Sequence, residues 1–398
     1  MSPFFSFRKL SILLIVSLLM LQFTSCFRGS SKLSLPVLYI TTEEEIPWEE
    51  RIPCLLSVVT DNDSIVLDGK VKLRGGFSSK FYKHSYALKL YEAQSLCGMP
   101  SNRNWILNAS YIDKTFMRHK LCYDLFNLMG DNDLAPQSSY ALVRENGRPV
   151  GLYLVTQRLN KQVLQLNSDD HNAVIFKEPK IFYPDDKLPS PSLFDENYQE
   201  QTYPDFDKRD CSYMMDSLRA FIIQTPDQEF YEKVSEIFDL QNVIDWHLFL
   251  LFTNGGDNVN KNFYLYKQDS QTPYRIALWD CDHSFGRDCD NEKNMLERLV
   301  NDKDNLLLNR LLQSNDYQLA MTKRYRELRD SGIFSYDRIQ KMMKDNDPWV
   351  RLGLEENMEL WPFDSENYYD SANYDEEYAL ILEFVTLNLQ RLDQVFGY

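Results

Sequence analysis

The pattern of hydrophobic and polar positions divides the chain into two parts. In the first part, short runs rich in β-branched and apolar residues, such as residues 35–42, predict strands. Asp68-Gly69 and Asn146-Gly147 each lie between two such runs, and both dipeptides are typical of tight β-hairpins. A single stretch with helical spacing interrupts the runs. Residues 35–160 therefore predict an antiparallel sheet with one inserted helix.

The second part, residues 161–398, begins with a polar segment and then becomes helical. Residues 167–211 are polar and rich in proline, so we expect an irregular surface insertion there. The apolar run 240–252 predicts a buried helix, and residues 376–396 carry apolar side chains at alternating spacings of four and three. The pattern thus predicts an α+β fold with a sheet-rich N-terminal lobe and a helical C-terminal lobe. Active sites often lie in clefts between such lobes.

The first 25 residues have the pattern of a signal segment. Arg8 and Lys9 precede an apolar run, residues 10–21, that is too short for a comfortable membrane span. Small residues and Cys26 follow, which resembles the lipobox of a bacterial lipoprotein, cleaved before Cys26 and lipidated on it. An ordinary secretory signal and an uncleaved anchor are the alternatives. The lipoprotein interpretation predicts a tether over residues 26–34 and a lipid-anchored protein of the bacterial cell envelope, facing the periplasm or the surface.

Composition narrows the classes of function. The chain has 398 residues, of which 43% are hydrophobic and 14% aromatic, as expected for a packed globular protein. Its net charge of −16 argues against nucleic acid as a partner, although an acidic surface would attract a basic protein. The cysteines beyond Cys26 show no regular spacing. Cys281 and Cys289 flank a loop and could form a disulfide, which the sequence alone cannot decide.

The stretch 254–286 carries the candidate chemistry. A loop with two glycines presents Asp257 and, five positions later, Asn262. The catalytic loop of protein kinases has the same spacing, in which the aspartate takes a hydroxyl proton and the asparagine holds a metal. Two apolar runs follow as a predicted hairpin, and the second ends at Asp280 and Asp282, where paired carboxylates can bind Mg²⁺. Taken singly, each feature also fits an ordinary structural turn.

Several basic residues of the first part are candidates for binding phosphate. Lys89 alternates with apolar residues on a predicted strand, which suits a phosphate-binding lysine, although a solvated strand lysine is the better interpretation of this feature alone. Arg74 precedes two glycines, and a guanidinium beside an open backbone can bind phosphate oxygens in pairs. Lys72 and Lys83 are rival cations.

Six segments, in order, resemble the CotH kinase family of atypical protein kinases. They are residues 73–79, 83–90, 105–118, 146–154, 257–266 and 279–286. The resemblance implies a kinase-like two-lobe fold that uses ATP with Mg²⁺ or Mn²⁺ to phosphorylate serine or threonine of a protein substrate. Asp257 would then be the catalytic aspartate and Asn262 its metal-binding partner. Asp280 and Asp282 would hold the metal, and Lys89 would be the phosphate lysine.

One position departs from the family pattern. Gln157 stands where the family usually has a glutamate after the Gly-Leu-Tyr-Leu strand. A protein that had lost nucleotide binding in this way would be a kinase-fold surface module for a protein or glycan. The alternative is therefore a lipid-anchored binding protein with weak or no catalytic activity.

Overall fold

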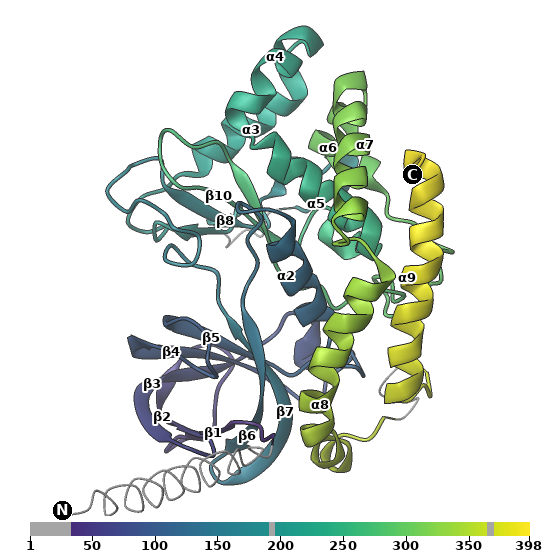
Figure 1. The fold of residues 1–398 in the computed structure, drawn as a ribbon. Coiled ribbons are helices and arrows are strands. Elements are labelled where there is room, and N and C mark those ends of the chain that lie inside the picture. The colour runs from purple at the N-terminus through teal and green to yellow at the C-terminus, as the bar shows by residue number, and fades with distance from the viewer. Residues whose placement is uncertain (1–32, 191–195, 364–369) are drawn as a thin grey trace, which may run out of the picture. The chain divides into compact units, whose positions relative to one another are not determined.

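The computed structural model describes residues 33–190, 196–363 and 370–398 (Figure 1). The predicted signal segment, the proposed lipidation site Cys26 and most of the predicted tether lie outside the described residues. Within the described ranges, no helix is both long enough and apolar enough to cross a membrane. The chain from Leu35 onward forms one compact unit, so the predicted boundary at residue 160 divides two regions of the same body.

The N-terminal region is a closed barrel of seven strands. The strands are β1 (Val37–Thr41), β2 (Ile52–Val59), β3 (Ser64–Arg74), β4 (Ser85–Gln94), β5 (Asn102–Asn108), β6 (Ser138–Glu145) and β7 (Arg148–Gln157). They follow the order β1-β2-β3-β4-β5-β7-β6, and the parallel pair of β1 and β6 closes the barrel. The other neighbouring pairs in this order are antiparallel. Apolar side chains that alternate along these strands fill the interior.

The barrel corrects the predicted antiparallel sheet. The local pattern predicts strands but not which distant edges meet, and here Val37 pairs with Leu142 across about a hundred residues of sequence. Closure leaves neither edge strand unpaired, which removes a liability of open sheets. The predicted hairpin at Asn146-Gly147 is confirmed between β6 and β7, with positive φ angles of 48° and 82°.

The hairpin predicted at Asp68-Gly69 is wrong, because both residues lie inside the long strand β3. Gly69 pairs with Leu90 on one side and Cys54 on the other. A Cβ atom at Gly69 would come within 2.9 Å of the Lys89 carbonyl oxygen, so the glycine permits a close approach of β4 rather than a turn.

The second region combines a small sheet with helices. Its sheet has the order β11-β10-β8-β9, formed by β8 (Val174–Lys177), β9 (Gln201–Tyr203), β10 (Phe263–Lys267) and β11 (Arg275–Leu278). The segment 167–211, expected to be irregular, therefore contributes two of the four strands. Short apolar runs inside a proline-rich stretch give a weak signal, and β8 is stabilised by pairing with the distant strand β10.

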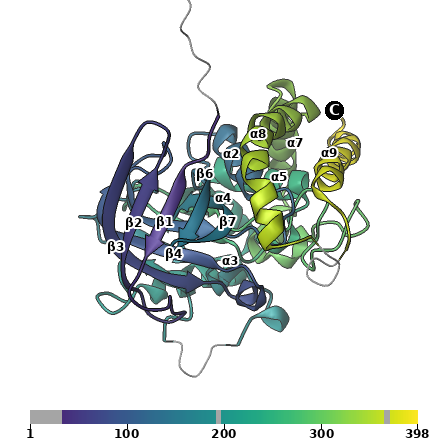
Figure 2. The same ribbon diagram turned by 90° about the horizontal axis from the view of Figure 1, so that it is seen from below.

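The described ranges also contain eight α-helices. They are α2 (Arg118–Met129), α3 (Ser212–Gln224), α4 (Asp227–Ile237), α5 (Leu240–Thr253), α6 (Leu306–Leu311), α7 (Asn315–Asp330), α8 (Tyr336–Leu360) and α9 (Tyr374–Phe396). Helix α5 has the predicted position and is buried around almost its whole circumference, with Asp239 accepting a capping hydrogen bond from the backbone of Asn242. Figure 2 shows the barrel strands on one side and α7, α8 and α9 on the other.

Gly286 lies where helix α9 approaches the loop after β11. Its φ angle is +92°, and a Cβ atom there would lie 2.4 Å from a methyl carbon of Leu380 and 3.3 Å from Cβ of Phe384. We therefore expect Gly286→Ala to destabilise the fold by about 1–3 kcal/mol through overpacking, in addition to the cost of a positive φ. Gly147→Ala is the matched control, since Gly147 also has a positive φ but no heavy atom within 4 Å of the position that a Cβ would take. Equal losses in urea unfolding of the two variants would contradict this view of Gly286.

Candidate active site

The loop that follows helix α5 presents Asp257. Helix α5 ends at Asn254, which has a left-handed conformation (φ 53°), and a single 3₁₀ turn, Gly256–Asn258, carries the aspartate. The buried amide of Asn258 donates hydrogen bonds to the carbonyl oxygens of Asn262 (3.0 Å) and Trp279 (2.9 Å). These bonds fix the loop against the end of strand β11.

Both carboxylate oxygens of Asp257 have a partner. Oδ2 accepts a hydrogen bond from Nδ2 of Asn262 at 2.7 Å, so the two residues predicted from their spacing are in contact. Oδ1 lies 2.8 Å from Nζ of Lys261, a residue that no motif in the sequence singled out. The Asp257 side chain is 13% exposed, and Lys261 is about half exposed. Asp257 is thus oriented by one fixed amide and one more mobile cation.

The two predicted metal ligands lie together beyond strand β11, and a histidine joins them. Nε2 of His119, from helix α2, is 2.9 Å from Oδ1 of Asp280. Candidate ligand atoms of His119, Asp280 and Asp282 all lie within 4.8 Å of one another. His119 precedes Asp280 by 161 residues, so no local spacing could have revealed the contact.

The pKa values of Asp280 and Asp282 are shifted in opposite directions. Burial raises the pKa of Asp280, but its hydrogen bond with His119 and the charges of His119, Arg74 and Lys177 more than compensate and hold it below its usual range. Burial raises the pKa of Asp282, and the charge of Asp280 acts in the same direction, against His283. A divalent cation would relieve this repulsion between carboxylates.

The donor set fits a hard divalent cation. Carboxylate oxygens of Asp280 and Asp282 and the amide oxygen of Asn262 are the ligand types that Mg²⁺ and Mn²⁺ prefer. His119 is engaged with Asp280 and serves to orient that carboxylate. Asp257 borders the same cavity.

These groups line a cavity of about 620 Å³ between the barrel mouth and the second sheet. Its lining includes Arg74 and the glycine-containing turn after it, Lys83, Lys177, Asp257, Asn262, Trp279, Asp280 and Asp282. The guanidinium of Arg74 lies 5.6 Å from the centre of the Trp279 ring. The structure therefore brings together Arg74 and the four acidic and amide residues predicted for the site.

Lys89 does not lie in this cavity. It is exposed on β4, opposite Asn104 and Lys70, and is absent from the cavity lining. Alternation along the strand correctly predicts that Lys89 points out of the barrel. On β4, however, the residue that lines the cavity is Ser85. Four residues of strand separate the two positions by about 13 Å. The position of Lys89 therefore does not suit a phosphate-binding lysine of this cavity.

Two other lysines reach the cavity. Lys83 is buried, and its Nζ donates hydrogen bonds to the carbonyls of Ala109 (2.9 Å) and Leu152 and to Oδ1 of Asn357 (2.9 Å). Burial lowers the pKa of Lys83 well below its usual value. Lys177, at the end of β8, forms an ion pair with Glu178 at 2.9 Å.

Gln157 does not take part in the predicted site, and the cysteines of the described ranges form no disulfide. Gln157 is buried at the end of β7, where Nε2 donates to the carbonyl of Pro100 at 2.9 Å, and it does not line the cavity. Its side chain therefore has a structural contact. None of the cysteines in the described ranges forms a disulfide; Cys281 is buried and Cys289 is exposed.

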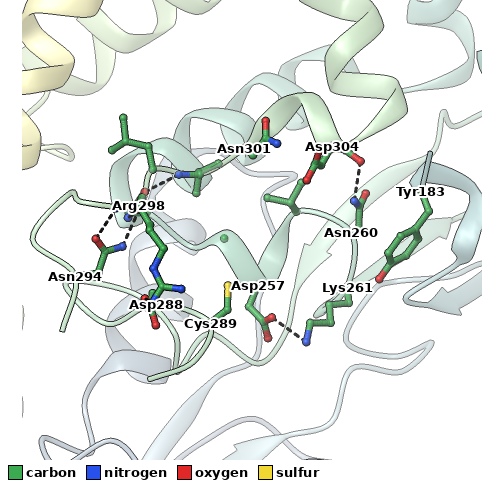
Figure 3. Close-up of a pocket in the computed structure, with 15 residues that line it drawn as sticks. Tyr183, Asp257, Asn260, Lys261, Asp288, Cys289, Asn294, Arg298, Asn301 and Asp304 are labelled. Atoms are coloured by element: carbon green, nitrogen blue, oxygen red, sulfur yellow. Dashed lines mark hydrogen bonds and ion pairs between the residues drawn. The ribbon is translucent and has the colours of Figure 1, made fainter. Parts of the chain in front are cut away.

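A second cavity, of about 370 Å³, adjoins the first (Figure 3). Asp257, Lys261 and Cys289 border both cavities. Figure 3 shows the carboxylate of Asp257 directed toward Lys261, with Tyr183 beyond the lysine. Asp257 thus stands between two separate spaces.

Comparison with known proteins identifies the family of this mixed α+β protein. A family model described as CotH kinase protein matches residues 71–392. The chain belongs to the CotH kinase family. It is 25% identical over 362 residues to inner spore coat protein H of Bacillus subtilis (strain 168), a match that covers 88% of this chain and 92% of that protein.

Among solved structures, the chain is similar to a crystal structure of the proinflammatory kinase CtkA of Helicobacter pylori. The match has a TM-score of 0.31 and 11% sequence identity, and it covers 78% of this chain and 94% of that one.

The contact between His119 and Asp280 predicts a pH dependence of stability. Burial lowers the pKa of His119, but the hydrogen bond with Asp280 and the charges of Asp282, Asp280 and Asp113 raise it overall, to about 9 from an ordinary 6.5. The raised pKa stabilises the folded protein fully at pH values below the pKa of His119 in the unfolded chain. This stabilisation is lost as pH rises through the pKa of His119 in the folded protein. We expect the metal-free protein to lose on the order of 3 kcal/mol from this group between pH 6 and pH 10.

Urea unfolding across this pH range, in the presence of a chelator, measures the effect. His119→Gln should flatten the pH dependence, whereas His171→Gln, at an exposed histidine, should preserve it. If the free energy of unfolding changes with pH equally in wild type and His119→Gln, the pKa of His119 is not raised by folding.

Proposed function

We propose that this protein transfers the γ-phosphate of ATP to serine or threonine of a protein substrate. The observation that carries the proposal is the convergence of Asp257, Asn262 and the Asp280–Asp282 pair on one wall of a single cavity. Phosphoryl transfer needs little more than in-line positioning and stabilisation of charge, and these residue types provide both. Membership of the CotH kinase family supports the same reaction.

In the proposed reaction, each group has one role. The acceptor oxygen forms a bond to the γ-phosphorus, the bond from that phosphorus to the β,γ-bridging oxygen breaks, and ADP leaves. The hydroxyl proton passes to the carboxylate of Asp257. Arg74 and Lys177 border the cavity and are suited to bind phosphate oxygens. Asp280, Asp282 and Asn262 would hold Mg²⁺ or Mn²⁺, which would neutralise phosphate charge.

Asp257→Ala tests the proposed base. We expect the variant to lose phosphoryl transfer by about two orders of magnitude or more, because a positioned general base typically contributes that much. Transfer is measured with labelled ATP, Mg²⁺ or Mn²⁺ and a serine-rich protein. The control is Asp316→Asn, which alters an exposed carboxylate on α7 outside both cavities and should keep wild-type activity.

Thermal stabilisation separates binding from chemistry in the same variants. Only a ligand that binds the folded state raises the melting temperature by mass action. Wild type should be stabilised by ATP only when metal is present, and Asp280→Asn should lose this stabilisation. Equal label transfer by wild type and Asp257→Ala would refute the proposed reaction.

We also propose that the protein is exported and anchored by lipid on Cys26 in the bacterial cell envelope. The support is the signal pattern before Cys26, which lies outside the described residues. Metabolic labelling with a clickable fatty acid should modify the wild type in its bacterial host, and Cys26→Ser should abolish the label. Cys54→Ser is the control, since Cys54 is buried inside the barrel and should not affect lipidation. Unchanged labelling of Cys26→Ser would exclude this anchor.

A further inference from the structure

Lys261 touches the proposed base and borders the space proposed for the nucleotide. Its Nζ lies 2.8 Å from Oδ1 of Asp257, and its side chain is 49% exposed. Figure 3 shows the ammonium of Lys261 beside the carboxylate of Asp257. The same side chain lines the first cavity together with Asp280 and Asp282. A cation in this position is within reach of Asp257 and of a phosphate bound in the first cavity.

The other two lysines of the first cavity are more fully occupied. Lys83 is buried, and its three N–H groups already donate to three acceptors within the fold. Lys177 is close to two carboxylates, those of Glu178 (2.9 Å) and Glu200 (3.6 Å). Within the described ranges, Lys261 is paired with one carboxylate, although its ammonium carries three N–H donors. Lys261 is therefore the lysine of this cavity that can most readily take a further anionic partner.

The proposed reaction changes the charge opposite Lys261. Before transfer, the carboxylate of Asp257 is negative and attracts the ammonium. Once the acceptor proton reaches Asp257, the carboxyl group is neutral and this attraction falls. In the same step, the negative oxygens of the phosphoryl group move toward the acceptor. A cation that changes partner at this moment stabilises the transition state more than the ground state, which is the condition for catalysis.

We propose that Lys261 is a catalytic residue, which pairs with Asp257 in the resting protein and binds an oxygen of the phosphoryl group during transfer. The inference rests on the proposed function and adds one residue to it. The acceptor oxygen bonds to the γ-phosphorus, the bond to the β,γ-bridging oxygen breaks, and ADP leaves. The hydroxyl proton passes to Asp257, while Lys261 keeps its own proton and exchanges one anionic partner for another.

Removal of the ammonium should slow transfer without weakening nucleotide binding. We expect Lys261→Ala to lower kcat about a hundredfold, because one donor aimed at developing charge typically contributes that much. The KM for ATP and the thermal stabilisation by ATP with Mg²⁺ should stay at wild-type values, since the resting ammonium is engaged with Asp257. Lys261→Arg keeps the charge and should retain more of kcat than Lys261→Ala.

The matched control is Lys233→Ala on helix α4. Lys233 also pairs with a carboxylate four residues earlier, that of Glu229 at 2.6 Å, and is 52% exposed, but it borders neither cavity. The control therefore removes an ion pair of the same spacing and similar lysine exposure, and it should keep the wild-type kcat. An equal loss of kcat in both variants would overturn the assignment.

A double variant tests whether Lys261 acts only by orienting Asp257. If it did, Lys261→Ala would have no further effect once the carboxylate is gone. We expect Asp257→Ala combined with Lys261→Ala to transfer less label than Asp257→Ala alone, because the phosphoryl group still loses its cation. Equal transfer by these two proteins would make Lys261 a positioning residue and would refute the proposal.

A transition-state analogue gives a readout that does not depend on turnover. ADP with Mg²⁺ and aluminium fluoride imitates the phosphoryl group in transfer. We expect it to raise the melting temperature of wild type above that with ADP and Mg²⁺ alone. Lys261→Ala should lose most of this additional shift, and Lys233→Ala should keep it. An undiminished additional shift in Lys261→Ala would contradict the proposed contact.

The results separate this inference from the proposed function. If wild type transfers phosphate and Lys261→Ala does so with an unchanged kcat, the reaction stands and Lys261 has no part in it. If Lys261→Ala also loses the stabilisation by ATP with Mg²⁺, Lys261 serves nucleotide binding, and the proposed change of partner is wrong. If wild type is neither stabilised by ATP with metal nor active in transfer, the proposed function fails, and the role of Lys261 fails with it.

Discussion

The buried guanidinium of Arg118 holds the parts of the site together. It donates to Asp113 at 2.7 Å, to the carbonyl of Ser284 at 3.0 Å and to Glu377 at 2.9 Å. These partners belong to the segment after the barrel strand β5, the loop after β11 and helix α9. A buried charge costs several kcal/mol unless it is fully paired, so the three segments cannot separate cheaply. Because Arg118 opens α2, the network also fixes the next residue, His119, against Asp280.

The two cavities differ in how their charges are balanced. In the first, burial raises the pKa of both Asp280 and Asp282, but the hydrogen bond with His119 and the charges of His119, Arg74 and Lys177 bring that of Asp280 below its usual range. This arrangement suits a metal and a polyphosphate. In the second, Asp257 pairs with Lys261 and Asp304 with Lys187, whereas Arg298 is shared by three carboxylates, those of Asp288, Asp290 and Glu292. Asp257, Lys261 and Cys289 border both cavities.

Features of the sequence that depend on nearby residues could be predicted, and features that depend on distant contacts could not. Helix α5, the turn at Asn146-Gly147 and the contact of Asp257 with Asn262 each follow from residues a few positions apart. Barrel closure, the strands inside 167–211 and the role of His119 depend on pairings between residues far apart in the sequence. Lys89 was predicted only in part. Alternation along the strand predicts the face on which Lys89 lies, but it does not predict how far along the strand a cavity lies.

The geometry of Asp257 indicates which of its oxygens can accept a proton. Both oxygens are engaged, so a substrate hydroxyl must replace one partner or share it. Asn262 is only 8% exposed, and its amide is held by the same loop that carries the aspartate. Lys261 is 49% exposed and ends a flexible side chain at the border of both cavities. Of the two partners, Lys261 is the more exposed and therefore the easier to displace from the carboxylate. Under the proposed function, Oδ1 is therefore the basic atom, and Lys261, once displaced, is free to turn toward the transferred phosphate.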